Sequence, residues 1–198
     1  TDDNQNNLPN LSLFDDFLKK NIFDIEKKLK DFIQRINLII DSKEFLTIQL
    51  SIKKKINTDK ISENELIHLL NEAKEQCRET IGDRKITHLI IDNYITDGKK
   101  NDYFPENSES EIFSIDLRFI CLSNRYINNL EKILKNYQVS IDQILCLDYV
   151  NSFLNHKNEN IFEMSIKLID GYNKNEVKII PKKSKNTGFF ERFFNFFN

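Results

Sequence analysis

Histidines and glycines are the residues whose spacing would first reveal metal binding or phosphate chemistry in this sequence. The three histidines, His68, His88 and His156, stand far apart and lack the spacing of metal ligands. The four glycines are equally scattered, so no two of them could form a loop that cradles a phosphate group. Each histidine is interpreted as an ordinary structural or surface residue. We therefore expect a protein without catalytic activity, metal or cofactor.

Thiols and carboxylates are the other groups that could do chemistry. The cysteines are odd in number and have no Cys-x-x-Cys spacing, so we expect reduced, mostly buried thiols in a cytosolic protein. They are Cys77, Cys121 and Cys146. The carboxylates at Asp92, Asp97 and Asp116 are interpreted as turn residues or residues on a solvent-facing surface. No pair of them is assigned to acid–base catalysis.

A phenylalanine-rich tail, residues 188–198, gives the strongest physical signal. On a helix that turns ~100° per residue, its six phenylalanines share one arc of roughly 160°. Such a helix would be only about 15 Å long, too short to cross a bilayer but able to lie in its interface. Nearby basic side chains would contact anionic headgroups, each contributing about 1 kcal/mol. The expected membrane-binding residues are Phe189, Phe190, Phe193, Phe194, Phe196, Phe197, Lys182, Lys183, Lys185 and Arg192.

Two other interpretations of the tail remain open at this point. The helix could dock on the protein's own core, or it could fill the groove of a soluble partner. An isolated helix of this length is marginal in water, so it should fold only when it binds something.

The composition limits the classes of protein that the chain could belong to. Its 198 residues suffice for one ordinary domain with appendages, and the formal net charge of −2 gives no drive towards nucleic acid. Charge is unevenly distributed, because five basic residues and one acidic residue lie between Lys178 and Arg192. This asymmetry of charge is typical of a tail that binds a surface. No apolar run approaches the ~20 residues that a membrane-spanning helix needs.

The first fifty residues are expected to form a helix and a strand. Residues 1–10 are polar and acidic and predict a disordered start. Apolar residues then recur every three or four positions from Leu11 to about Asp41, which predicts a helix whose strongest part is residues 23–40. Phe45 to Ile52 alternates and predicts a strand. We assign residues 11–52 to this N-terminal helix and strand.

The central part predicts a small α/β (α+β) domain over residues 53–155. Ser62 and Glu65 have the spacing of a capping box and open a helix that ends near Gly82. From about residue 53 to 147 the expected order is strand, helix, strand, strand, helix, strand. That order is typical of a split βαβ plait, in which two helices cover one face of a sheet. Residues 156–187 are expected to be a linker.

The same plait also describes RNA-recognition sheets, so the fold is compatible with RNA binding. Those sheets need exposed aromatic residues beside basic ones. The strand expected at 112–122 has Phe113 and Phe119 on one side and Asp116 and Arg118 on the other. The Lys/Arg-Gly-aromatic signature of these sheets does not occur in the sequence. We therefore expect no nucleic-acid partner.

Taken in order, the segments resemble the FtsA family of bacterial cell-division proteins. Ile61 to Lys74 looks like the helix that opens the family's inserted subdomain, called 1C. Tyr94–Gly98 looks like the end of the next strand, and Asn128–Lys132 like part of the second helix. Val139–Ile144 resembles the strand that leaves the subdomain. The tail behind a basic linker is similar to the family's membrane-targeting sequence.

The resemblance implies a cell-division adaptor of the septum. FtsA is an actin-like protein that links the FtsZ ring to the inner membrane. By this resemblance the chain would be a peripheral protein on the cytoplasmic face of the bacterial inner membrane. Its partners would be other division proteins or FtsA-like subunits, with FtsZ as a further candidate. The family's glycine-rich phosphate motifs do not occur here, so ATP binding is not carried over and most of the actin-like body is missing.

Two functions from different classes follow. The first is a non-catalytic adaptor that holds division-ring components at the membrane through protein contacts and the amphipathic tail. Its partner surface is expected on an uncovered sheet edge or on the helix around residues 124–137, where the candidate residues are Arg125, Asn128, Asn129 and Lys132. The alternative is a soluble oligomeric scaffold whose phenylalanine-rich tail packs in its own core or in a dimer interface.

Overall fold

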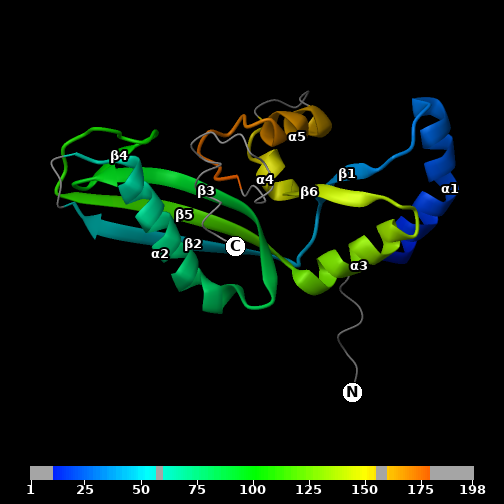
Figure 1. Ribbon diagram of the computed structural model, residues 1–198, viewed down its shortest axis with the longest axis horizontal. Coiled ribbons are helices and arrows are strands. Elements are labelled where there is room, and N and C mark those ends of the chain that lie inside the picture. Colours follow the sequence, from blue (N-terminus) through cyan, green and yellow to red (C-terminus); the bar gives the residue numbers. More distant parts are fainter. Residues whose placement is uncertain (1–10, 57–59, 155–159, 179–198) are drawn as a thin grey trace, which may run out of the picture. The chain divides into compact units, whose positions relative to one another are not determined.

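The computed structural model of the protein describes residues 11–56, 60–154 and 160–178, and these residues form a mixed set of helices and strands (Figure 1). The α+β class expected from the sequence is confirmed, because both kinds of element are present and the strands form two sheets. The helices are α1 (Leu11–Leu29), α2 (Glu63–Ile81), α3 (Asn124–Lys135), α4 (Leu147–Asn151) and α5 (Ile161–Ile169). The strands are β1 (Arg35–Ile40), β2 (Phe45–Lys55), β3 (Arg84–Thr96), β4 (Lys99–Asn101), β5 (Ile112–Ser123) and β6 (Ser140–Cys146).

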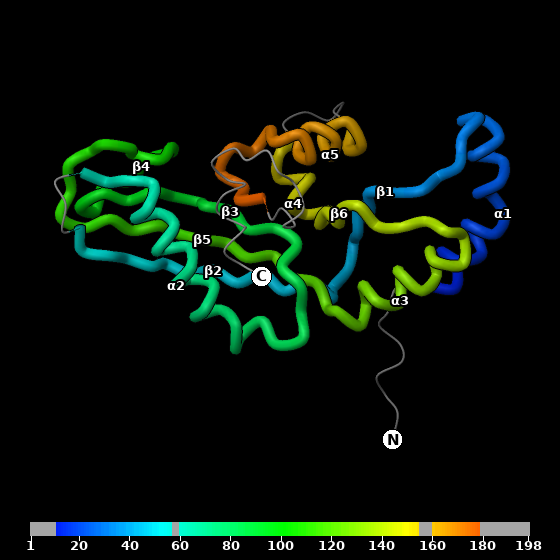
Figure 2. Tube along the Cα trace, in the orientation of Figure 1, coloured from blue at the N-terminus to red at the C-terminus, as the bar shows by residue number. Residues whose placement is uncertain are grey.

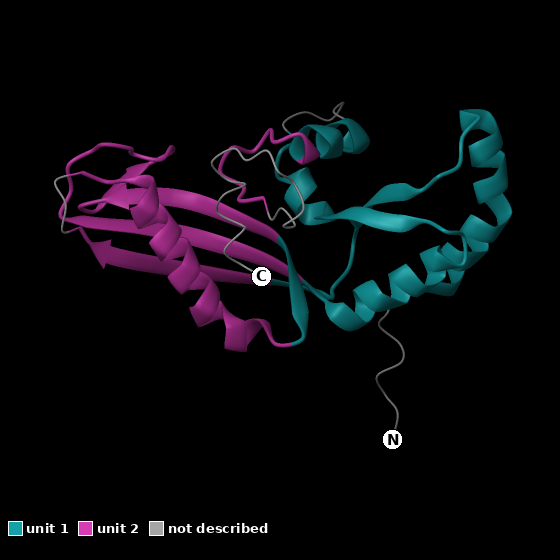
Figure 3. Cartoon of the chain, in the orientation of Figure 1, with its two compact units in different colours: residues 1–46, 83–87, 122–168 teal, residues 47–82, 88–121, 169–198 magenta. Residues whose placement is uncertain are grey.

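The chain divides into two compact units (Figure 3). Unit 1 comprises residues 1–46, 83–87 and 122–168, and unit 2 comprises residues 47–82, 88–121 and 169–198. The chain passes between the units within β2, just before β3, within β3, within β5 and within α5, so these boundaries differ from the segment bounds expected from the sequence.

Unit 2 is built on a four-stranded sheet with the order β2-β5-β3-β4. The strand β5 alternates between buried and half-buried side chains over its first half, as a strand covered on one face does. Its apolar face includes Phe113, Ile115 and Phe119, none of which is exposed. The helix α2 lies across the sheet, and its buried side chains Leu66, Leu69 and others supply the other side of the core (Figure 1).

The expected plait is corrected at its last strand. The strand β6 does not join the sheet of unit 2 but pairs in parallel with β1, in a two-stranded sheet of unit 1. The pairing runs from Arg35 opposite Ser140 to Ile40 opposite Cys146. The expected order of elements is present with the short strand β4 added between β3 and β5, but the strand that should close the sheet pairs with β1 instead. The expectation that two helices cover the sheet is also wrong, because α3 packs in the core of unit 1.

The helix expected to continue to Asp41 is wrong beyond Leu29. Lys30 adopts a φ of 57°, which ends α1, and residues 35–40 form β1. The spacing of Ile33, Ile36 and Ile39 suits a helix, but Ile36, Leu38 and Ile40 also alternate, and β-branched residues favour a strand. The alternation prevails because these side chains are the ones that pack in the core of unit 1.

The core of unit 1 lies between its sheet and the helices α1 and α3. One cluster joins Ile40 to Leu122 and Tyr126, and partly buried Phe14 and Ile144 pack against it. A second cluster consists of Leu18, Leu134 and Val139. The phenol of Tyr137 donates a hydrogen bond to Asp15 Oδ1 at 2.9 Å, which fixes α1 against the end of α3.

The capping box at the start of α2 is not formed as expected. Ser62 takes the N-cap position, but its hydroxyl makes no capping hydrogen bond. The Glu65 carboxylate pairs instead with Lys54 Nζ at 2.6 Å, across to the neighbouring strand β2. The lysine ammonium group binds a carboxylate more strongly than a backbone N–H does. Glu65 therefore pairs with Lys54 rather than with the start of the helix.

Part of the expected linker at 156–187 is folded. Residues 161–169 form α5, and the segment after it pairs with β3 through an antiparallel bridge between Ile90 and Glu176. Ile91 N donates to Asn175 O at 2.9 Å, and Val177 N donates to Leu89 O at 2.8 Å. Figure 2 shows this segment running beside β3. The apolar residues Met164, Leu168 and Val177, which are buried, explain why this part of the chain folds.

Candidate partner-binding surface

The helix α3 is held firmly at its first turn. Asn124 Nδ2 donates to Asp83 Oδ1 at 2.8 Å, and Asn124 N donates to Asp83 O at 3.2 Å. Ser123 occupies the N-cap and accepts from Tyr126 N at 3.5 Å. An N-cap oxygen and a fixed first residue orient the whole helix, so its outward face has a defined direction.

The two faces of α3 differ sharply. The buried face is Tyr126, Ile127, Leu130 and Leu134. The partner residues expected from the sequence lie on the opposite face, with Arg125, Asn128 and Lys132 exposed and Asn129 half-buried. The structure therefore brings all four side chains to one side of one helix.

This face continues into a hollow at the C-terminal end of α3. The hollow has a volume of about 390 Å³ and is lined by residues of the helix end, the turn after it and the start of β6. Its lining residues are Glu131, Lys135, Gln138, Val139, Ser140 and Ile141. Gln138 has a φ of 59°, and this left-handed residue turns the chain so that β6 starts beside the helix.

The chemistry of the surface suits an acidic protein segment. Arg125, Lys132 and Lys135 supply three cations, and Glu131 is the one carboxylate among the residues described for the face and hollow. Arginine and lysine bind carboxylates through charge-assisted hydrogen bonds, and the three amides of Asn128, Asn129 and Gln138 can pair with a peptide backbone. We call residues 125, 128, 129, 131, 132, 135 and 138 the α3 surface.

The open face of the unit 2 sheet carries polar groups that bind one another. Asp116 accepts hydrogen bonds from Ser51 Oγ and from Asn93 Nδ2. Arg118 Nη2 donates to Asp92 Oδ1 at 2.7 Å. These contacts use both carboxylates in holding strands together, in keeping with their interpretation as residues of a solvent-facing surface.

Asp97 is a turn residue, as the sequence indicates. It has a φ of 47° and precedes Gly98 at 83°, so the pair forms the two-residue connection from β3 to β4. Its carboxylate accepts from Ile112 N at 2.8 Å and from Glu111 N. The hydrogen bond from the Ile112 backbone, with a smaller one from Glu111, lowers the pKa of Asp97.

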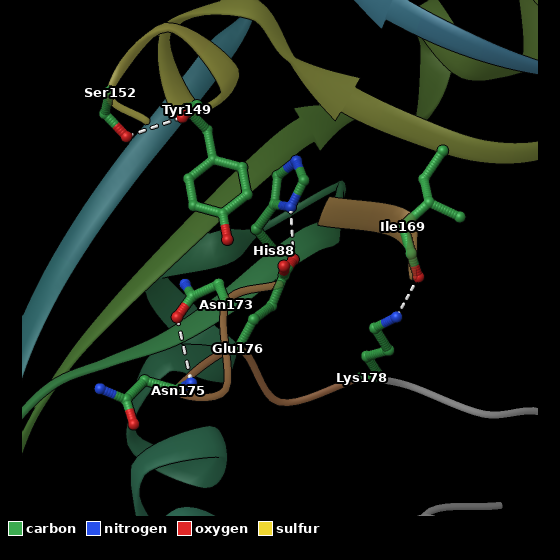
Figure 4. A network of polar contacts seen from close by, with 8 residues as sticks. All are labelled: His88, Tyr149, Ser152, Ile169, Asn173, Asn175, Glu176 and Lys178. Atoms are coloured by element: carbon green, nitrogen blue, oxygen red, sulfur yellow. Dashed lines mark hydrogen bonds and ion pairs between the residues drawn. The ribbon is translucent and has the colours of Figure 1, made fainter. Parts of the chain in front are cut away.

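A buried histidine and glutamate join the last described segment to β3 (Figure 4). His88 Nδ1 lies 2.7 Å from Glu176 Oε1, and the His88 side chain is 3% exposed. Lys178 Nζ donates to the carbonyl of Ile169 at the end of α5, and Asn175 N donates to Asn173 Oδ1 at 3.0 Å. His88 thus acts as a structural residue, as expected, although its partner was not foreseen.

The other groups considered for chemistry do not gather into a site. In residues 11–56, 60–154 and 160–178, no three His, Cys, Asp or Glu side chains lie close enough to hold a metal ion. All three cysteines are buried and none of them forms a disulfide, and burial raises the pKa of Cys77. His68 is exposed on α2, and His156 lies outside the described residues. Phe113 and Phe119 are fully buried, so they are not available to stack on bases.

The expected membrane-binding residues, 182–198, all lie outside the described part of the chain, as does the expected disordered start at 1–10. Within the part that is described, no helix is long and apolar enough to cross a membrane. The structure does describe the segment from which the tail departs, because residues 175–177 are hydrogen-bonded to β3.

Sequence reasoning missed the hollow and the Glu176 contact. Lys135 and Gln138 could have been found, because a basic residue in the last turn of a helix and an amide residue after it are typical of a helix end. The pairing of Glu176 with His88 joins positions 88 residues apart and leaves no local signal. Comparison with family models and with curated proteins gave no match for this chain.

Proposed function

We propose that this protein is a non-catalytic adaptor that holds other proteins at an anionic membrane surface. The α3 surface would bind an acidic segment of a partner, and the phenylalanine-rich tail would bind the membrane. From the resemblance to the FtsA family, we propose that the partners are division proteins or FtsA-like subunits, with FtsZ as a further candidate. The site of action would then be the cytoplasmic face of the bacterial inner membrane.

The observation that carries the proposal is the attachment of the segment before the tail. Residues 175–177 pair with β3 through two backbone hydrogen bonds, and the buried contact of Glu176 with His88 reinforces them. These contacts fix the segment that precedes the tail to the folded unit. Six phenylalanines follow between residues 189 and 197, behind three lysines.

Sedimentation with anionic vesicles tests the membrane part of this proposal. We expect the intact chain to sediment with vesicles that contain phosphatidylglycerol, and a chain cut after Thr187 to stay in the supernatant with its circular dichroism unchanged. Added salt should weaken binding, because basic residues contribute to it. The proposal fails if the intact chain does not bind such vesicles.

The second candidate function is the soluble oligomeric scaffold. It is favoured by one observation, the exposure of several large apolar side chains on and after α1, which include Phe17, Phe23 and Phe32. Surfaces of this kind mark sites of protein association. Unfolding of the domain on removal of the tail, with no lipid binding by the intact chain, would favour this candidate.

A further inference from the structure

The helix α1 has an inner face that packs in unit 1 and an outer face that is open to solvent. Leu11, Phe14 and Ile22 pack against the two core clusters, and Leu18 is buried. On the outer face, Leu13 is 63% exposed and Phe17 is 53% exposed. Two large apolar side chains one turn apart on the solvent side lower the solubility of a protein unless another surface covers them.

More apolar surface follows at the C-terminal end of the same helix. Leu29 is 61% exposed and Phe32 is 79% exposed. Of the ten large hydrophobic side chains exposed in the described residues, five fall between Leu13 and Phe32. Four of the five lie on α1 itself, with Phe23 in its second half at 73% exposed, and Phe32 follows the end of the helix. The concentration of such residues on one helix marks it as an association surface.

The charges on the outer face identify the partner. Asp16, Lys20, Asp24 and Lys28 are all exposed and lie within about 120° of one another on the helix. If a second α1 is laid antiparallel, with Lys20 opposite Asp24, then Asp16 comes opposite Lys28. Each ion pair occurs twice, because the arrangement has a twofold axis through the middle of the helix.

The same register places the two exposed apolar residues of the outer face in the contact. Leu13 and Phe17 of one copy come opposite residues 31 and 27 of the other, whereas Leu29 lies ~160° from the centre of the outer face and takes no part in it. The aliphatic stem of Lys27 would cover the ring of Phe17. A parallel arrangement would put like charges together, Asp16 beside Asp16 and Lys28 beside Lys28.

We propose that two copies of this chain associate through antiparallel pairing of their α1 helices. The outer face pairs with itself, with Lys20–Asp24 contacts near the twofold axis, Asp16–Lys28 contacts towards the two ends, and Leu13 and Phe17 packed beside them. This self-association is separate from the lipid binding of the tail. For an adaptor at a membrane, it would double the number of tails and partner surfaces in one assembly.

The test is a charge swap in the intact chain, with the dimer dissociation constant measured by analytical ultracentrifugation. Asp16→Lys alone and Lys28→Asp alone should each weaken the dimer by roughly tenfold or more, because each creates two like-charge contacts. The double variant Asp16→Lys/Lys28→Asp should recover to within about threefold of the unsubstituted protein. Lys19→Glu is the matched control, since Lys19 is exposed on α1 but lies ~120° from the centre of the outer face.

Rescue by the double variant is diagnostic of pairing between two copies. The residues at 16 and 28 are about 18 Å apart along one helix, so they cannot compensate for each other within it. A chain that is monomeric at high micromolar concentration would overturn the proposal. So would association that the single substitutions leave unchanged, or that Lys19→Glu weakens equally.

Discussion

The Glu176 carboxylate helps to hold the last described segment on β3 through its contact with the buried His88, and the loss of this contact should be measurable. Replacing Glu176 with Ala removes the carboxylate that lies 2.7 Å from His88 Nδ1. We expect the free energy of unfolding to fall by about 1–3 kcal/mol, because a buried polar atom loses a partner. Urea denaturation measures it, with the exposed Glu163→Ala as the control, expected to stay within about 0.5 kcal/mol. An equal effect of both substitutions would contradict a structural role for the contact.

Asp97 should make stability depend on pH. Its pKa is lowered by the hydrogen bonds from Ile112 N and Glu111 N, so its ionised form is favoured in the folded state. This stabilisation is present above the unfolded value of about 3.9 and is lost as the pH falls through the lowered pKa. The difference in unfolding free energy between the protein and Asp97→Asn should therefore shrink below about pH 4. A difference that stays constant into strong acid would contradict this explanation.

Local signals predicted most single residues well. The turn at Asp97-Gly98, the buried cysteines and the apolar face of β5 all follow from side-chain chemistry within a few residues. The capping box at Ser62 failed because Glu65 had a better partner, Lys54, in another strand. Local reasoning cannot foresee such a contact, because it depends on which elements the fold brings together.

At the scale of elements, the core around Leu134 should be the most sensitive part of unit 1. Leu134 on α3 is fully buried and packs with Leu18 of α1 and Val139. We expect Leu134→Ala to lower the free energy of unfolding by about 2–5 kcal/mol, through lost burial and the cavity left behind. Lys132→Ala, on the exposed side of the same helix, is the control. If thermal or urea unfolding gave the same result for both variants, this packing would be wrong.

The positions of the helices and strands were predicted better than the pairing of the strands. Helices α2 and α3 and strands β3 and β5 lie close to their expected positions, since their periodicity is strong. The apolar spacing of residues 35–40 fits both a helix and a strand, and the prediction of a helix there is wrong. Only the pairing of β1 with β6 decides between the two. The pairing of distant strands depends on the whole core, so the sequence did not predict that β6 leaves the plait.

At the scale of the whole molecule, the α3 surface should govern binding to protein partners. Reversing Arg125 and Lys132 together to Glu should abolish binding of the proposed division-protein partners to the intact chain, because both cations are exposed on the proposed binding face. Arg78→Glu on α2 is a control, since Arg78 is also exposed but lies in unit 2. Partner binding that survives the double reversal would exclude this surface.

The proposed location of the protein rests on the tail, whose residues the sequence alone characterises. Replacing Phe190 and Phe194 with Ser in the intact chain would remove apolar surface from the expected helix while keeping its length and charge. The decisive measurement is flotation of this variant with anionic vesicles, together with its urea unfolding midpoint in the absence of lipid. We predict that flotation is lost while the midpoint is unchanged. Flotation equal to that of the unsubstituted chain, or a lowered midpoint without lipid, would contradict the membrane anchor.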